Sequence, residues 1–229
     1  MWAIIKKEVK TYFLSPIGYV FIGIFLIAFS ISFYLELMYT GGRVQFNYIF
    51  TYLPTILSFA ILIPLLTMRA FSEERKNGTE QLLLTSPISI TKIVIAKFIS
   101  ALIITLIALA CTSMFLIIIR CFGTLDITAA LVTIFGFILL AMSYISIGIL
   151  ASSITENQII AALITIITFV ATWVLPEFLQ TGASFSLINM FSKFTTGQIN
   201  IAYTVTYLAF TVLCLILTIT VMQRRKSAK

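Results

Sequence analysis

Six long uncharged, apolar runs constrain the fold of this chain more than any other feature. A helix needs about 20 apolar residues to cross the roughly 30 Å hydrocarbon layer of a membrane. Each run is long enough for one such crossing and too short for two. We therefore predict an all-α, polytopic membrane protein with six transmembrane helices, over residues 16–37, 51–69, 93–119, 129–153, 157–176 and 202–222.

Composition supports a membrane protein over a soluble one. Of the 229 residues, 60% are hydrophobic and 10% are charged, whereas a soluble domain carries about 25% charged residues. In water such a chain would expose a large apolar surface, and a bilayer removes that cost. The net charge of +7 comes from basic residues beside the uncharged runs, which favours anionic lipid headgroups over nucleic acid as the partner.

The distribution of Lys and Arg predicts the orientation. With six crossings, both termini and the loop at 70–92 lie on one side of the membrane. Cytoplasmic loops are enriched in Lys and Arg, so we expect a multi-pass protein of the cell (plasma) membrane with both termini cytoplasmic. The predicted inner side holds twelve basic residues and the outer side only Arg43, Arg120 and Lys193; the twelve are Lys6, Lys7, Lys10, Arg69, Arg75, Lys76, Lys92, Lys97, Arg224, Arg225, Lys226 and Lys229.

Residues 1–15 have the pattern of an amphipathic helix. Apolar residues, beginning at Trp2, recur at helical spacing, while Lys6, Lys7 and Lys10 face elsewhere. This predicts a helix in the headgroup plane whose lysines contact anionic lipid. A plain basic flank that only orients the first span is the alternative. The run that follows is too long for a signal peptide and no cleavage site follows it, so we expect it to remain in the mature protein.

The predicted cytoplasmic elbow, residues 70–92, is the most charged stretch. Asn77 with Glu80 three residues later is typical of a helix start, and the apolar turn 81–84 stops before Pro87. We expect a short helix lying across the membrane face. Charges of both signs beside leucines suit the docking of another protein, but a solvated loop that only sets the topology fits these residues equally well.

Two further connections are predicted. Thr155 and Gln158 have the spacing of a capping box, so we expect Thr155 to cap the fifth span after a tight turn at Glu156. The outward loop 177–201 is rich in apolar residues, which predicts short re-entrant helices in the outer leaflet, ended by Gly182 and Gly197.

Chemistry-bearing residues are scarce. The chain has no histidine, one aspartate and no P-loop motif, which excludes Ser–His and paired-aspartate proteases and ATP binding by a P-loop. We predict no catalytic residue, cofactor or metal. Gly148 and Ser152 form a small-residue pair that favours close helix packing over a polar path. A transport subunit driven by a separate motor, a sodium-coupled carrier and a non-transporting assembly scaffold all remain open.

The elbow sequence Met68–Pro87, MRAFSEERKNGTEQLLLTSP, resembles the motif of ABC-2 type permeases, the membrane subunits of ATP-binding-cassette transporters. Residues 1–19, the turn 152–158 and the Arg224–Arg225 end are also similar to that family. The chain most resembles the branch that includes gliding-motility and nitrous-oxide-reductase-maturation transporters.

The resemblance implies a mechanism. Two copies of this chain, or this chain and a related permease, would pair above two P-loop ATPase subunits. ATP-driven closure of those subunits would push the elbow and the N-terminal helix and open a path outward, as in an exporter. The resemblance implies ATPase contacts at Glu73, Glu74, Arg75, Gly78, Thr79, Glu80 and Leu83.

Overall fold

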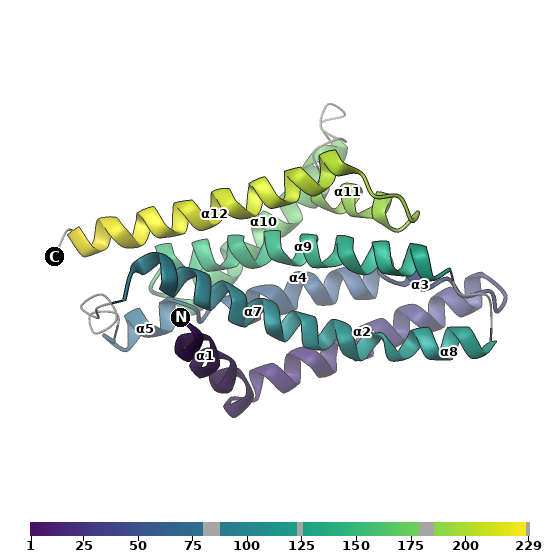
Figure 1. Ribbon diagram of the computed structural model, residues 1–229, viewed down its shortest axis with the longest axis horizontal. Coiled ribbons are helices and arrows are strands. Elements are labelled where there is room, and N and C mark those ends of the chain that lie inside the picture. Colours follow the sequence, from purple (N-terminus) through teal and green to yellow (C-terminus); the bar gives the residue numbers. More distant parts are fainter. Residues whose placement is uncertain (80–87, 123–125, 179–185, 228–229) are drawn as a thin grey trace.

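A computed structural model describes residues 1–79, 88–122, 126–178 and 186–227 (Figure 1). Within these ranges every regular element is a helix, which confirms the predicted all-α class. The helices are α1 Trp2–Leu14, α2 Ile17–Tyr39, α3 Phe46–Ile49, α4 Leu53–Thr67, α5 Ser72–Lys76, α7 Ile90–Thr112, α8 Met114–Phe122, α9 Ile127–Ile154, α10 Gln158–Phe178, α11 Leu187–Phe194 and α12 Ile201–Ser227.

Long helices run between the two ends of an elongated bundle (Figure 1). Among the described residues, five helical stretches are long and apolar enough to cross a membrane: Ile17–Tyr39, Leu53–Lys76, Ile90–Cys121, Ile127–Ile154 and Ile201–Lys226. The apolar helix α10 follows the fourth of these. Helix α9 is the most buried of the five, because it packs against α4, α7, α10 and α12.

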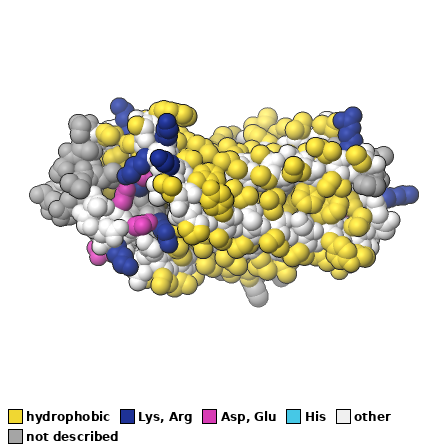
Figure 2. All heavy atoms as spheres, turned by 90° about the horizontal axis from the view of Figure 1, so that it is seen from below, with side chains coloured by type: hydrophobic (Ala, Val, Ile, Leu, Met, Phe, Trp, Pro, Cys, Tyr) yellow, Lys and Arg dark blue, Asp and Glu magenta, His cyan; other side chains and the backbone are white. Residues whose placement is uncertain are grey.

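The two ends of the bundle differ in charge. Both termini, α1 and α5 lie at one end, called here the charged end, and α3, α8 and α11 lie at the other (Figure 1). Figure 2 shows most of the charged side chains of one face gathered at the charged end, and an apolar belt along the rest of that face. This belt matches the surface that the hydrocarbon core of a bilayer requires.

Aromatic rings fill the interior of the bundle. Phe137 of α9 lies at their centre, with ring centroids 5.8 Å from Phe25, 5.0 Å from Phe50, 4.9 Å from Phe59 and 5.9 Å from Phe191. These partners come from α2, α11 and the segment from α3 to α4. Tilted and edge-to-face ring pairs of this kind add to the stabilisation from burial, so the cluster fixes α9 relative to the helices around it.

The predicted cap of α10 is wrong. Asn157, not Thr155, caps this helix, since its side-chain oxygen accepts the N–H of Ile159 at 2.9 Å. Thr155 ends α9 instead, with its hydroxyl donating to the carbonyl of Ala151 at 3.1 Å. The capping-box pattern failed because the same threonine is used to terminate the preceding helix.

The predicted cap in the elbow is also wrong. Asn77 follows the last residue of α5, and its N–H donates back to the carbonyl of Glu73 at 3.0 Å. Helix α5 begins at Ser72, before the predicted start, and Glu80, the other half of the predicted helix start, lies outside the described residues. The apolar turn predicted at 81–84 lies outside the described residues.

In the loop 177–201, predicted to lie outward, α11 buries its apolar side chains against α9 and α10. Gly197 follows it with a positive φ of 80°, a conformation in which glycine carries little strain. Gly182 lies outside the described residues.

Candidate functional site

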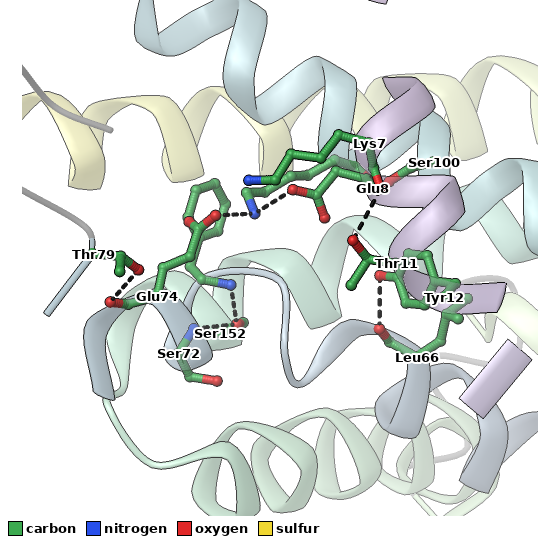
Figure 3. Close-up of polar contacts among 12 residues, drawn as sticks. Lys7, Glu8, Thr11, Tyr12, Leu66, Ser72, Glu74, Thr79, Ser100 and Ser152 are labelled. Carbon is green, nitrogen blue, oxygen red and sulfur yellow. Dashed lines mark hydrogen bonds and ion pairs between the residues drawn. The ribbon is translucent and has the colours of Figure 1, made fainter. Parts of the chain in front are cut away.

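The candidate site is the charged end of the bundle, where α5 meets the ends of the long helices. The chain turns sharply between α4 and α5, and Ser152 of α9 holds this turn. The Ser152 hydroxyl accepts the N–H groups of Phe71 and Ser72 at 2.9 and 3.1 Å (Figure 3). It also donates to the carbonyl of Met68 at 3.1 Å. One hydroxyl thus satisfies three backbone groups that the turn leaves without helical partners.

Gly148, one helical turn before Ser152, brings α9 very close to α4. A Cβ atom on Gly148 would lie 2.0 Å from the hydroxyl oxygen and 2.7 Å from the Cβ of Thr67. Only glycine fits this contact. The two residues predicted to pack helices therefore lie at the contact that sets the position of the elbow.

A buried lysine joins three elements on one side of α5. The side chain of Lys97, in α7, is only 3% exposed, and its ammonium lies 2.9 Å from Glu74 of α5 and 3.2 Å from Glu8 of α1 (Figure 3). It also lies 5.1 Å from the centroid of the Phe71 ring. Charge-assisted hydrogen bonds in a partly desolvated site are stronger than exposed ones, so α1, α5 and α7 are held together here.

On its other side, α5 is joined to the end of α9. The Arg75 guanidinium donates to the carbonyl of Ile154 at 3.1 Å and pairs with Glu156 at 2.7 Å. Arg225 of α12 donates to the same carbonyl at 3.0 Å. Two guanidinium groups thus meet at the C-terminus of α9, where the helix dipole favours positive charge.

Helix α1 has a second attachment, through Tyr12. The Tyr12 hydroxyl is buried and donates to the carbonyl of Leu66 in α4 at 3.0 Å (Figure 3). Burial, followed by the negative charges of Glu8 and Glu73, raises the pKa of this hydroxyl above its usual range. The proton therefore stays in place to donate the hydrogen bond.

The edge of the elbow that follows α5, residues 76–79, is exposed. Lys76, Asn77, Gly78 and Thr79 are all exposed, and the backbone turns at Gly78 with a φ of 71°. Beside this edge, a hollow of about 430 Å³ is lined by Lys76 and by residues 156–159 of the turn between α9 and α10. The exposed edge and this hollow form a surface that another protein can reach.

The residues predicted as ATPase contacts fall into four groups. Glu74 and Arg75 are engaged in ion pairs within the chain, whereas Gly78 and Thr79 lie on the exposed edge. Glu73 is half-buried near Tyr12. Glu80 and Leu83 lie outside the described residues.

On α1, the predicted lipid-facing lysines Lys6, Lys7 and Lys10 are exposed, as is Trp2. Glu8, in contrast, lies on a more buried face of α1, and its side chain is only 17% exposed. Helix α1 thus presents basic side chains outward while its carboxylate points to the bundle.

Sequence reasoning missed Lys97, Glu8, Glu156 and Arg225. It counted Lys97 and Arg225 only as topology signals, used Glu156 only to place a turn and gave Glu8 no role. Lys97 lies inside the predicted span 93–119, and a charged residue within a span normally requires a partner. That signal could have singled it out.

The hydroxyl residues inside the spans are used in packing. Ser143 contacts Thr211 of α12 at 3.3 Å, and the Tyr144 hydroxyl contacts Thr172 of α10 at 2.9 Å. Such contacts join helices inside a membrane protein. They support the packing interpretation of these residues over a polar path.

Comparison with known proteins gives one family match. The profile of a family described as "ABC-2 family transporter protein" matches residues 2–228, nearly the whole chain. No curated protein gives a significant match.

Proposed function

This chain belongs to the ABC-2 family of transporter proteins and is a multi-pass permease subunit of an ABC transporter, and from that premise we propose that a separate ATPase drives it through the elbow. The charged end would then face the cytoplasm, with both termini inside. Transport would run outward. A second copy, or a related permease, would complete the transmembrane unit.

The observation that carries the proposal is the double attachment of α5. Its Glu74 pairs with Lys97 of α7, which also pairs with Glu8 of α1, and its Arg75 donates to the end of α9. The edge that follows α5 is exposed. A protein that pushes on the exposed edge therefore acts on the ends of several spans at once. The chain has no P-loop motif, so in this proposal the energy of ATP enters through such a contact.

Orientation follows from the charge of the two ends. Basic residues concentrate at the charged end (Figure 2), and this bias marks the cytoplasmic side of membrane proteins. The elbow and its hollow would then face the compartment that holds ATP. Exposed Lys6, Lys7 and Lys10 on α1 would contact anionic lipid headgroups of the inner leaflet.

The experiment measures how much P-loop ATPase co-purifies with variants of the permease expressed beside its genomic neighbours. Thr79→Arg places a bulky charge on the exposed edge. We expect it to reduce co-purification about thirtyfold, the factor that corresponds to the roughly 2 kcal/mol of an interface hot spot, while the thermal unfolding temperature stays unchanged. Arg43→Glu, at the opposite end of the bundle, is the matched control and should leave both quantities unchanged.

Charge reversals inside the elbow distinguish residues that dock the ATPase from residues that hold the elbow in place. Glu74→Arg and Arg75→Glu should lower both co-purification and unfolding temperature, since both residues form ion pairs within the chain. If every elbow variant retains the full amount of ATPase, the elbow is not the docking surface. Uphill transport by the purified permease alone would show a carrier with its own energy source.

A further inference from the structure

We infer that Lys97 is a shared counterion that locks the interfacial helix α1 to the elbow, so that α1 and α5 move as one body. This inference deepens the proposed function, on which it rests for its role in transport. Lys97 is a positioning residue here. It acts through Glu8 and Glu74 and not on the transported molecule.

The geometry requires the lysine. Glu8 and Glu74 come from elements 66 residues apart in the chain, and both reach the same ammonium, at 3.2 and 2.9 Å. Their side chains are 17% and 18% exposed, so water screens them only partly. Without the ammonium, two carboxylates would face each other across a short gap and repel.

The negative charges of this cluster also outnumber the positive one. One lysine serves two carboxylates, and the second oxygen of Glu74 is buried without a hydrogen-bond partner among the described residues. The arrangement therefore depends on Lys97 more than on either glutamate. Losing one glutamate leaves a complete ion pair, whereas losing Lys97 leaves two like charges.

The lock links a membrane-surface element to a docking element. Helix α1 carries exposed Lys6, Lys7 and Lys10, while Glu8 faces Lys97. The exposed edge follows α5 at its C-terminal end. A displacement of the elbow therefore pulls α1 with it.

The test measures distances between pairs of spin labels on introduced cysteines, after Cys111, Cys121 and Cys214 are replaced by alanine. Labels at Lys7 and Asn77, both exposed, report the separation of α1 from the elbow in the purified permease. We expect one narrow distance in the parent chain. In Lys97→Met the ratio of molecules at that distance to molecules at other distances should fall by about tenfold or more, as for loss of a charge-assisted hydrogen bond.

Three variants keep the test decisive. Lys97→Arg preserves the charge and should keep the narrow distance, which a general packing defect would not predict. Lys92→Met removes an exposed lysine from the same helix and should change nothing. Glu8→Ala removes the ion pair of α1 with Lys97 but keeps the Tyr12–Leu66 hydrogen bond and the Glu74 ion pair. It should therefore broaden the distance even if Lys97→Met fails to fold. A narrow, unchanged distance in Glu8→Ala would overturn the lock.

Motion is tested in the complex with the co-purified ATPase. A reference label replaces Tyr39, which is exposed at the opposite end of the bundle. A non-hydrolysable ATP analogue should shift the distances from Tyr39 to Lys7 and to Asn77 together, and in Glu8→Ala it should shift only the distance to Asn77. Independent shifts in the parent chain would refute the lock. Failure of any ATPase to co-purify would refute the proposed function, while the Lys7–Asn77 distance would still test the lock.

Discussion

Replacing Gly148 with alanine should destabilise the bundle far more than one methyl group normally does. The new Cβ would lie 2.0 Å from the hydroxyl oxygen of Thr67 and 2.7 Å from its Cβ. A Cβ is fixed to the backbone, so no rotation of Thr67 removes the second clash. Helices α4 and α9 must move apart by about 1 Å to restore ordinary contact distances near 3.5–4.0 Å.

Overpacking of this kind costs about 1–3 kcal/mol. For a chain of this length, each kcal/mol lowers the unfolding temperature by about 2–4 °C, so Gly148→Ala should unfold roughly 2–12 °C lower. Gly23→Ala is the matched control, because a Cβ at Gly23 meets nothing within 4 Å. Alanine is also the better helix former, so this control should be neutral or slightly stabilising.

The assay is thermal unfolding of the purified permease in one detergent. The double variant Thr67→Gly/Gly148→Ala exchanges the small residue between helices and should recover part of the lost stability. An unfolding temperature for Gly148→Ala equal to that of Gly23→Ala would refute the close contact of α4 and α9. It would also remove the argument that this contact positions Ser152 and the elbow.

Three further substitutions test the attachments of the elbow. Ser152→Ala leaves two buried N–H groups without an acceptor, so we expect it to lose about 1–3 kcal/mol for each, measured as unfolding free energy. Tyr12→Phe should lower the unfolding free energy by about 0.5–1.5 kcal/mol and remove a pH dependence of that free energy. The pKa of Tyr12 is raised in the folded state. Its contribution to stability is therefore complete below the ordinary tyrosine pKa of about 10 and falls as the pH rises above that value. Gly78→Ala meets no atom within 4 Å but must adopt a φ of 71°, so it should cost about 1 kcal/mol through strain alone, measured by hydrogen exchange of the elbow.

The bundle could be predicted from the sequence because hydrophobic length and charge bias act locally along the chain. The all-α class followed from these. The N-terminal helix was predicted over 1–15 and the structure has α1 at Trp2–Leu14. Gly148 and Ser152 were also recognised locally, as small residues one turn apart on a span. The sequence could not show that their partners are Thr67 and the turn before α5.

The ion pairs could not be predicted because they join residues distant in the chain. Lys97 meets Glu8, 89 residues away, and Arg75 meets Glu156, 81 residues away. Single-sequence patterns carry no information about such pairs. For the same reason, Thr155 was predicted to cap α10, since a local pattern cannot tell which of two adjacent helices uses its hydroxyl.

The most direct test of the central claim is photocrosslinking in cells from the exposed edge of the elbow. A photoreactive amino acid at Asn77 should capture a protein that carries a P-loop and hydrolyses ATP, identified by mass spectrometry and by its activity. The same amino acid at Tyr39, exposed at the opposite end, should not capture it. Capture of that ATPase from Tyr39 and not from Asn77 would contradict both the orientation and the docking surface.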